Sequence, residues 1–284
     1  MRRDILSSPR LTELKKRRRR AILNKFLILL LGLLVVFGLL AYLSRLNNLN
    51  IAEIQISGNK VVETEMIKTT VEQEITGKYL WLFPKTNILY YPQNTIRNVL
   101  QGEFKRLKDI NFSIENNKIL KVSLTERVAK YTWCGNTLLI NNQKCYFLDE
   151  DGYIFDEAPY FSGEVYFKFY GSTDILPEIL GSAFAKGNFK QLISFKDVLI
   201  DLNLKPVMLS IAENGVIEIF LSKNASIAIG PKIILKIDSD FQNVAENLKA
   251  ALNTEPLLSK FKNKYSSLLY IDLRFGNKVY YKFQ

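Results

Sequence analysis

The 284-residue chain contains no histidine. This absence removes the commonest general base, the commonest metal ligand and every Ser–His or Cys–His catalytic arrangement. The glycine-rich phosphate loops of nucleotide-binding enzymes are also missing from the sequence. We therefore expect no cofactor, no metal site and no catalytic residue, and we predict that the protein is not an enzyme.

Two acidic clusters are the remaining candidates for chemistry. Asp149-Glu150-Asp151-Gly152 resembles the start of a calcium loop, but an EF-hand loop needs its glycine at the sixth position and a glutamate at the twelfth. Glycine stands fourth here, which favours a solvated β-turn. Asp238 and Asp240 precede an expected helix, and we interpret them as N-terminal capping carboxylates.

Charge is absent from one long stretch. Residues 26–43, FLILLLGLLVVFGLLAYL, carry no charged side chain and show no polar face. As a helix they would extend roughly 27 Å, close to the ~30 Å hydrocarbon core of a bilayer. The stretch predicts a single transmembrane helix rather than a buried helix of a globular core.

The charges that flank this stretch predict its orientation. Residues 1–25 contain ten basic and two acidic residues, so they hold +8 of the formal +11. The basic residues nearest the helix are Arg17, Arg18, Arg19, Arg20 and Lys25. The positive-inside rule leaves this tail in the cytoplasm and sends the residues after Leu43 across the membrane. The same cluster attracts anionic lipid, and we expect no nucleic-acid binding.

The alternative to a retained membrane anchor is a cleaved signal peptide, which the length of the apolar run disfavours.

Cysteine is scarce, and both copies follow the predicted membrane helix. Ten residues separate Cys134 from Cys145, which lie at the end of one expected strand and the start of another. Disulfides persist outside the cytoplasm, and closing so short a loop would contribute roughly 2–3 kcal/mol. We predict a structural disulfide, with a free buried pair or a redox or metal role as alternatives.

A first module is expected directly after the membrane helix. Asn47, Asn48 and Asn50 indicate a juxtamembrane linker, and residues 51–57 alternate as a half-buried strand that ends at Gly58-Asn59. A helix from Thr64 follows, with an apolar stripe of Met66, Ile67, Thr70, Val71 and Ile75, and Gly77 ends it. The aromatic cluster Tyr79-Leu80-Trp81-Leu82-Phe83 is expected to pack under that helix. A second helix over 93–100 and a hairpin, 110–116 with 118–128, complete the module.

The remaining residues predict a mostly β domain with helices packed on its sheet. Short strands are expected at 131–133, 138–140, 146–148 and 153–155, and a hairpin of 206–211 with 216–221 turns at Asn214-Gly215. Residues 226–229 add a strand, and 188–201 and 240–252 have helical apolar stripes. A closing hairpin, 268–275 with 279–283, turns at Gly276-Asn277.

Several segments, in order along the chain, resemble the FtsQ/DivIB cell-division family. The segments on which this resemblance rests are IQISGNKVVETEMI (54–67), VSLTERVAKYTW (122–133), CYFLDEDGYIFDEAP (145–159), SIAIGPKIILKIDSDFQNVAENL (226–248) and YIDLRFGNKVYYKF (270–283). The resemblance implies a membrane-anchored α+β protein with a POTRA-like βααββ domain followed by an FtsQ-type, mostly antiparallel β domain. It divides the chain into a cytoplasmic tail (1–25), a transmembrane helix (26–43), a linker (44–50), the POTRA-like domain (51–128) and the β domain (129–284).

The resemblance also implies a function and a binding surface. FtsQ-like proteins are scaffolds of the bacterial divisome in the cell membrane at the septum, and they recruit an FtsB/DivIC-like and FtsL-like pair that supports septal peptidoglycan synthesis. The matching edge here is Phe275, Gly276, Asn277, Lys278, Val279, Tyr280 and Tyr281. Other membrane division proteins are expected to bind the POTRA-like domain. An exported signal-anchored cell-wall enzyme or glycan-binding module is the alternative, and a POTRA-bearing translocation component is disfavoured by the single span.

Overall fold

The computed structural model describes residues 9–136, 138, 144–161, 165–172, 179–223 and 226–284. The chain divides into two compact units, Met1–Glu103 with Asp109–Thr125 and Phe104–Lys108 with Glu126–Gln284. The division after Thr125 lies close to the predicted boundary between residues 128 and 129.

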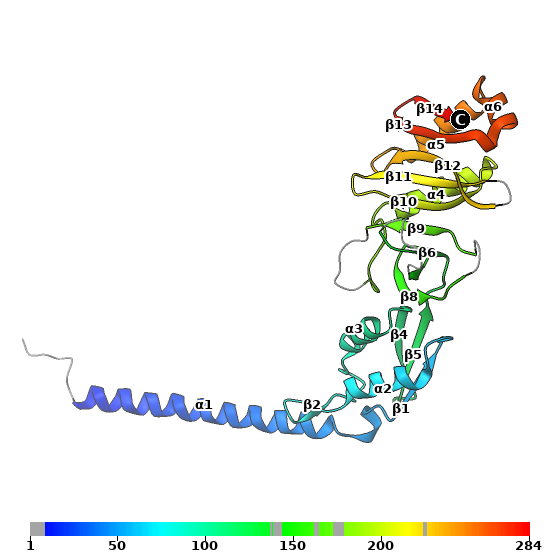
Figure 1. Ribbon diagram of the computed structural model, residues 1–284. Coiled ribbons are helices and arrows are strands. Elements are labelled where there is room, and N and C mark those ends of the chain that lie inside the picture. Colours follow the sequence, from blue (N-terminus) through cyan, green and yellow to red (C-terminus); the bar gives the residue numbers. More distant parts are fainter. Residues whose placement is uncertain (1–8, 137, 139–143, 162–164, 173–178, 224–225) are drawn as a thin grey trace, which may run out of the picture. The chain divides into compact units, whose positions relative to one another are not determined.

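The first unit begins with a long helix, α1 (Pro9–Leu43), shown in blue in Figure 1. Its segment Lys15–Leu43 is the one helix in the described part of the chain that is long and apolar enough to cross a membrane. A single apolar N-terminal helix of this kind fits a membrane anchor or a signal sequence. Arg17, Arg18, Arg19, Arg20 and Lys25 lie within α1 and are exposed, so the basic segment is helical and continuous with the apolar one.

A small α/β module follows α1 in the same unit. Its elements are β1 (Glu53–Ser57), α2 (Thr64–Ile75), α3 (Gln93–Glu103), β4 (Leu107–Glu115) and β5 (Ile119–Glu126). The predicted strand, helix, helix, strand and strand are all present in that order, and two short strands that were not predicted lie between the two helices. The sheet order is β1-β5-β4, and β1 pairs with β5 in parallel. Asn116 and Asn117 close the predicted hairpin, both with positive φ.

The packing of α2 agrees with the predicted stripe except at one position. Ile67, Thr70, Val71 and Ile75 are buried, whereas Met66 is half exposed. Met66 adjoins the stripe in sequence, but it lies on the solvent side of the helix. Its predicted place in the core is therefore wrong.

The aromatic cluster after α2 is not a packed layer beneath that helix. It forms a hairpin, β2 (Lys78–Tyr79) and β3 (Phe83–Pro84), whose turn contains Leu80 and Trp81. The side chains of Leu80 and Trp81 are 73% and 91% exposed. The prediction of burial is wrong for them, because both lie in the turn of the hairpin and are exposed.

Residues 44–50 are more ordered than a simple linker. A short 3₁₀ helix, η2 (Asn47–Leu49), lies within them. The side chain of the buried Asn87 donates to the Ser44 carbonyl over 3.0 Å, and the Ile88 amide donates to the Leu49 carbonyl over 3.0 Å. Backbone groups at the end of α1 are therefore satisfied by the module that follows.

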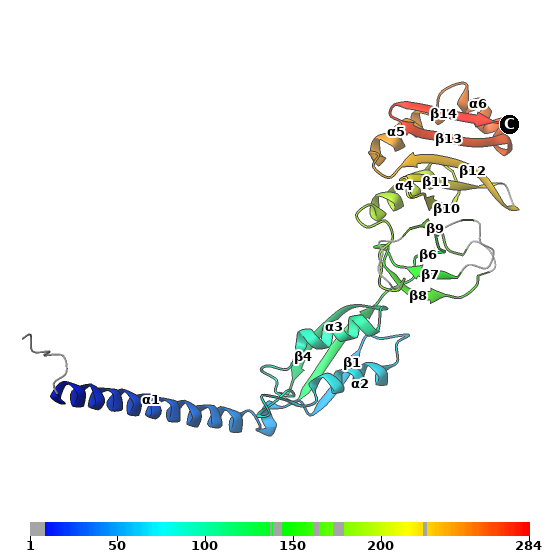
Figure 2. The same cartoon turned by 60° about the vertical axis from the view of Figure 1, so that its left-hand side comes forward.

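The second unit is built on one nine-stranded sheet, shown from two directions in Figures 1 and 2. The strands, in chain order, are β6 (Tyr131–Trp133), β7 (Cys145–Leu148), β8 (Ile154–Ala158), β9 (Lys168–Gly171), β10 (Pro206–Ile211), β11 (Val216–Lys223), β12 (Ser226–Lys236), β13 (Leu268–Phe275) and β14 (Lys278–Phe283). Their order in the sheet is β14-β13-β12-β11-β10-β9-β6-β7-β8. Most neighbours are antiparallel, and β12/β13, β9/β10 and β6/β9 are parallel. The strand expected at 138–140 lies largely outside the described residues.

Three helices pack on this sheet, α4 (Phe189–Asp201), α5 (Phe241–Leu252) and α6 (Leu257–Lys264), and a 3₁₀ turn, η3 (Tyr265–Ser267), follows α6. The helix α6 was not predicted. Leu192 and Phe195 of α4 and Leu248 of α5 join Ile233 of β12 and Ile271 of β13 in one buried core. The core therefore occupies the helix-covered face and holds the C-terminal strands in place.

Candidate functional site

The C-terminal hairpin ends the large sheet. Strand β14 is the last in the sheet order and pairs only with β13 among the described strands, with Ile271 opposite Tyr281 and Asp272 opposite Tyr280. A terminal strand leaves every second backbone N–H and C=O without a ladder partner. The predicted edge position is therefore present in the structure.

The turn of this hairpin is tied to the helix layer. Gly276 has φ +62°, a left-handed conformation in which glycine is favoured, and Asn277 follows it in the turn. The side-chain amide of Asn247 on α5 donates to the Gly276 carbonyl over 3.4 Å. This bond helps to hold the turn, and with it the start of β14, against α5.

Side chains alternate along β14 between two environments. Val279 and Tyr281 are half-buried and pack against the core, and the Lys260 ammonium lies 5.9 Å from the Tyr281 ring centroid. Lys278 and Tyr280 alternate with them and are exposed. Of the predicted partner-binding residues on the strand, Val279 and Tyr281 thus serve mainly to fix β14, while Tyr280 is accessible.

An exposed aromatic pair lies at the end of the hairpin. The rings of Phe275 and Tyr280 meet edge to face with centroids 5.3 Å apart. The two residues are 55% and 49% exposed, and the Arg274 guanidinium lies 5.6 Å from the Phe275 ring centroid. Large, partly exposed aromatic side chains are the residue type that most often anchors a protein partner.

A charged pair supports the aromatic pair. Arg274 donates from Nε and Nη2 to the two carboxylate oxygens of the buried Asp272, over 2.9 and 2.6 Å. Burial of Asp272 opposes its ionisation, but the hydrogen bonds from the Arg274 side chain and backbone outweigh burial and hold the Asp272 pKa below its usual value. The sequence analysis did not identify this pair. The i, i+2 spacing, which places two residues on one face of a strand, was the available signal.

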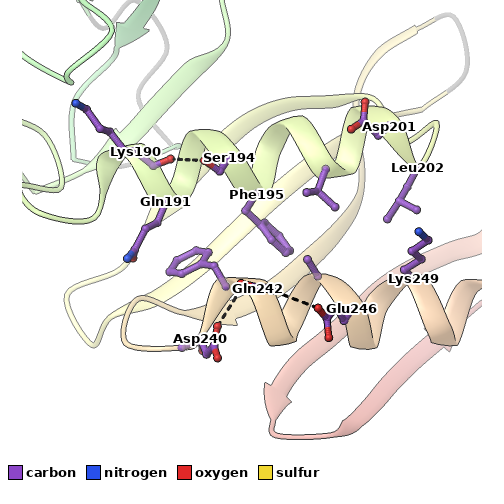
Figure 3. A pocket seen from close by; sticks show the side chains of 14 residues that line it. Lys190, Gln191, Ser194, Phe195, Asp201, Leu202, Asp240, Gln242, Glu246 and Lys249 are labelled. Carbon is purple, nitrogen blue, oxygen red and sulfur yellow. Dashed lines mark hydrogen bonds between the residues drawn. The ribbon is translucent and has the colours of Figure 1, made fainter.

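A second candidate is a groove between α4 and α5 with a volume of about 980 Å³ (Figure 3). Phe195 and Ala245 give it apolar lining, and charged residues such as Lys190 and Glu246 give it a polar rim.

Asp240, at the start of α5, accepts hydrogen bonds from the Gln242 and Asn243 amides and is the N-cap of the helix. The predicted capping role is confirmed for Asp240 and not for Asp238, which lies two residues earlier in the chain.

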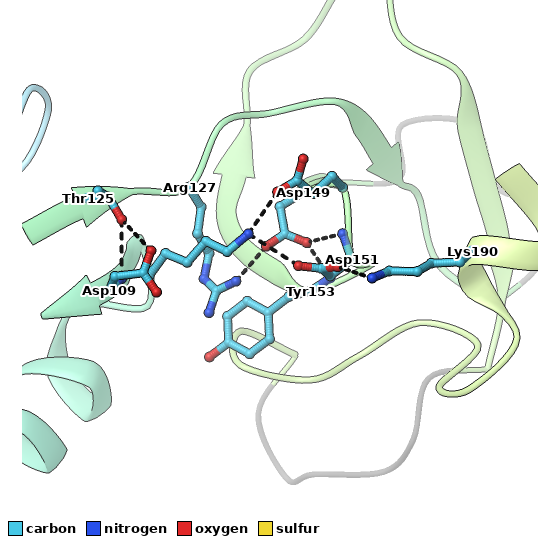
Figure 4. Close-up of polar contacts among 9 residues, drawn as sticks. Asp109, Thr125, Arg127, Asp149, Asp151, Tyr153 and Lys190 are labelled. Atoms are coloured by element: carbon cyan, nitrogen blue, oxygen red, sulfur yellow. Dashed lines mark hydrogen bonds and ion pairs between the residues drawn. The ribbon is translucent and has the colours of Figure 1, made fainter.

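The acidic turn between β7 and β8 has a structural role (Figure 4). The Asp149 carboxylate is 3% exposed, receives Arg127 Nη1 over 2.5 Å, and accepts the Asp151 and Tyr153 amides. The Arg127 guanidinium also lies 3.8 Å from the centroid of the Tyr153 ring. The interpretation of a wholly solvated turn is therefore wrong at Asp149. The cation that pairs with Asp149 is Arg127, which belongs to the Glu126-Arg127 sequence in the segment 122–133.

The neighbouring carboxylates bind lysines. Asp151 pairs with Lys190 and Lys108, each over 3.2 Å, and these two lysines hold the pKa of Asp151 below its usual value. Glu150 pairs with Lys108 over 2.8 Å. Among the residues that the structure describes, no group of three or more His, Cys, Asp or Glu side chains is arranged to hold a metal ion.

The predicted disulfide is present. Cys134 directly follows β6, Cys145 begins β7, and their sulfurs are bonded. The bridge joins the ends of two paired strands and closes the intervening loop. It lies at the part of the sheet formed by β6 and β7, so it stabilises the sheet and takes no part in the β14 edge.

No protein-family model matches the chain, and no curated protein matches it.

Proposed function

We propose that the protein is a membrane-anchored, non-enzymatic scaffold of the bacterial divisome that resembles FtsQ/DivIB. Helix α1 would anchor it in the cell membrane with the basic N-terminus in the cytoplasm. The two folded units would then lie outside the cytoplasm, where a disulfide such as Cys134–Cys145 persists.

The anchor is supported by the composition of α1. Its apolar part has the length of a membrane span, and exposed basic residues precede it on the side that the positive-inside rule assigns to the cytoplasm. The order β1-α2-α3-β4-β5 of the longer elements after α1, with the short hairpin β2–β3 between the helices, supports a POTRA-like domain, in which we propose a docking site for other membrane division proteins.

The observation that carries the proposed function is the free side of β14. A partner can add a strand there, and its backbone would pair with the N–H and C=O groups that β13 leaves unused. Backbone pairing of this kind gives affinity with little sequence preference, so the side chains beside the edge must supply specificity.

The Phe275–Tyr280 pair supplies such a specificity element. Its two rings offer an apolar contact next to the edge, and Asp272 and Arg274 lie on the neighbouring strand. We propose that an FtsB/DivIC-like and FtsL-like coiled-coil pair contributes the added strand. Through that pair the protein would support septal peptidoglycan synthesis without acting on a glycan bond.

Photo-crosslinking in cells tests this proposal. A photo-reactive amino acid at Tyr280 of the full chain should crosslink to the co-expressed FtsB/DivIC-like or FtsL-like protein of the same bacterium. The control position is Tyr160, which is 94% exposed in the same unit but follows β8, at the opposite end of the sheet from β14. Equal crosslinking from both positions would contradict the proposed function, and so would no crosslinking from either position when the full chain is present in the membrane.

A further inference from the structure

The hairpin β2–β3 of the first unit presents apolar side chains to its surroundings. Trp81 is 91% exposed, Leu80 is 73% exposed, and Tyr79 and Leu82 are about one-third exposed, at 37% and 36%. Leu80 and Trp81 both have positive φ, at 48° and 60°. Positive φ is unusual for bulky residues, and Asn and Gly are the usual choice in such a turn. The turn therefore holds two large apolar side chains outward in a conformation that their residue types disfavour.

The same hairpin lies beside the apolar helix. The rings of Phe83 in β3 and Phe37 in α1 meet with centroids 5.2 Å apart, and the Arg45 guanidinium donates to the Leu82 carbonyl over 3.3 Å. Figure 1 shows the hairpin alongside the last turns of α1. Phe37 precedes the end of α1 at Leu43 by six residues, or about 9 Å of helix. Phe83 is thus level with the apolar part of α1 and not with the residues beyond it.

The charge around the hairpin is of one sign. Lys78 begins β2 and Lys85 directly follows β3, and no acidic residue occurs in the sequence between Glu74 and Glu103. The Lys85 ammonium lies 5.9 Å from the centroid of the Tyr79 ring. Tryptophan is enriched at the boundary between lipid chains and water, and lysine stems can follow an apolar surface while the ammonium reaches phosphate groups.

We propose that the β2–β3 hairpin inserts Leu80 and Trp81 into the interfacial layer of the lipid leaflet at the C-terminal end of α1. This proposal rests on the membrane span proposed for α1. Lys78, Lys85 and Arg45 would meet the lipid headgroups. With α1 and the hairpin both in the bilayer, the first module would be held at two points rather than hinged at one.

Quenching of tryptophan fluorescence tests the proposal on the full chain. The protein is reconstituted in vesicles of phosphatidylcholine and phosphatidylglycerol, with and without phosphatidylcholine brominated near the headgroup. The chain has two tryptophans, and Trp133 is buried in the second unit. The Trp81→Phe variant therefore gives the Trp133 signal alone, and subtraction gives that of Trp81. We expect brominated lipid to quench most of the Trp81 emission and to leave the Trp133 emission unchanged, while aqueous iodide has little effect on Trp81.

Two other outcomes would overturn the proposal. Trp81 quenched by iodide and not by brominated lipid is exposed to water, and Trp81 quenched by neither is covered by protein. Alkaline carbonate extraction of the same vesicles separates this failure from failure of the proposed span. Release of the chain by carbonate contradicts the span itself, whereas retention with unquenched Trp81 contradicts only the inserted hairpin.

Discussion

The ring of Tyr280 meets the ring of Phe275 edge to face in the C-terminal hairpin, with centroids 5.3 Å apart, and both residues are partly exposed. The contact joins the middle of β14 to the end of β13 across the Gly276-Asn277 turn. It places an exposed aromatic surface on the last two strands of the sheet, β13 and β14.

The first prediction concerns this surface. Tyr280→Ala should weaken binding of the FtsB/DivIC-like and FtsL-like pair by about 2 kcal/mol, or about thirtyfold in Kd, as expected for an aromatic anchor. Titration of the labelled partner pair into the full chain in nanodiscs measures Kd. The matched control is Tyr160→Ala, which removes a more exposed tyrosine of the same unit and should leave Kd unchanged. Equal Kd values for both variants and the wild type would exclude the aromatic pair as an anchor.

The second prediction concerns the buried pair Arg127–Asp149. Arg127→Ala would leave the Asp149 carboxylate, 3% exposed, without its cation, and should lower the free energy of unfolding by about 3–5 kcal/mol. Lys144→Ala removes the partner of Glu157, but both of those side chains are largely exposed, so no measurable change is expected. Urea unfolding followed by Trp133 emission in a Trp81→Phe background compares the two. Similar small changes for both would show that Asp149 finds other partners.

The third prediction concerns pH. The Asp272 pKa is held below its unfolded value, so Asp272 contributes stability that is fully present above the unfolded pKa of about 3.9 and is lost as pH falls through the folded pKa. Asp272→Asn should therefore be less stable than the wild type at pH 7, and the difference should shrink as the solution is acidified below about pH 4. Unfolding by urea at a series of pH values measures this difference. A difference independent of pH would contradict the assignment to the charge on Asp272.

The fourth prediction concerns the disulfide. The variant Cys134→Ser/Cys145→Ser should lose about 2–3 kcal/mol of unfolding free energy, because the loop between β6 and β7 is no longer closed in the unfolded chain. Reduction of the wild type should cause the same loss. Maleimide should label both cysteines only after reduction of protein isolated from cells. Labelling without reduction would place this unit in a reducing compartment, against the proposed topology.

The fifth prediction compares two glycines of the first unit. Gly58 and Gly77 have similar φ values of +96° and +101°, but a Cβ at Gly58 would lie 1.9 Å from the Leu124 carbonyl oxygen, whereas one at Gly77 would meet nothing within 4 Å. Gly77→Ala should cost about 1–2 kcal/mol for the left-handed backbone alone. Gly58→Ala should cost clearly more, because β1 must move away from β5. Amide hydrogen exchange of β1 and β5 measures both, and equal exchange rates in the two variants would contradict the close approach.

Local elements were predictable because their signals are local. The helix starting at Thr64, the turn at Asn116-Asn117, the hairpin at Asn214-Gly215 and the Asp240 cap each depend on a few neighbouring residues. The order of strands was not predictable. Parallel pairing of β1 with β5, or of β12 with β13, depends on contacts between segments that are distant in the sequence. The alternation of apolar and polar residues within one strand does not indicate which strand it pairs with.

Burial was predicted wrongly for residues whose environment does not match their residue type. Trp81 was expected in a core because of its residue type, yet its turn projects it outward. Asp149 was expected in water for the same reason, yet Arg127 compensates its burial. At the candidate site the edge position followed from the sequence, whereas the separate roles of Tyr280 and Tyr281 required the register against β13.

Amide hydrogen exchange of β14 tests the central claim most directly. The full chain in nanodiscs is measured alone and with the FtsB/DivIC-like and FtsL-like pair. Strand addition predicts that the β14 amides that exchange readily in the free protein become protected in the complex, while exchange in α4 and α5 is unchanged. A complex that forms with protection confined to the α4–α5 groove, and with β14 exchanging as before, would contradict the account.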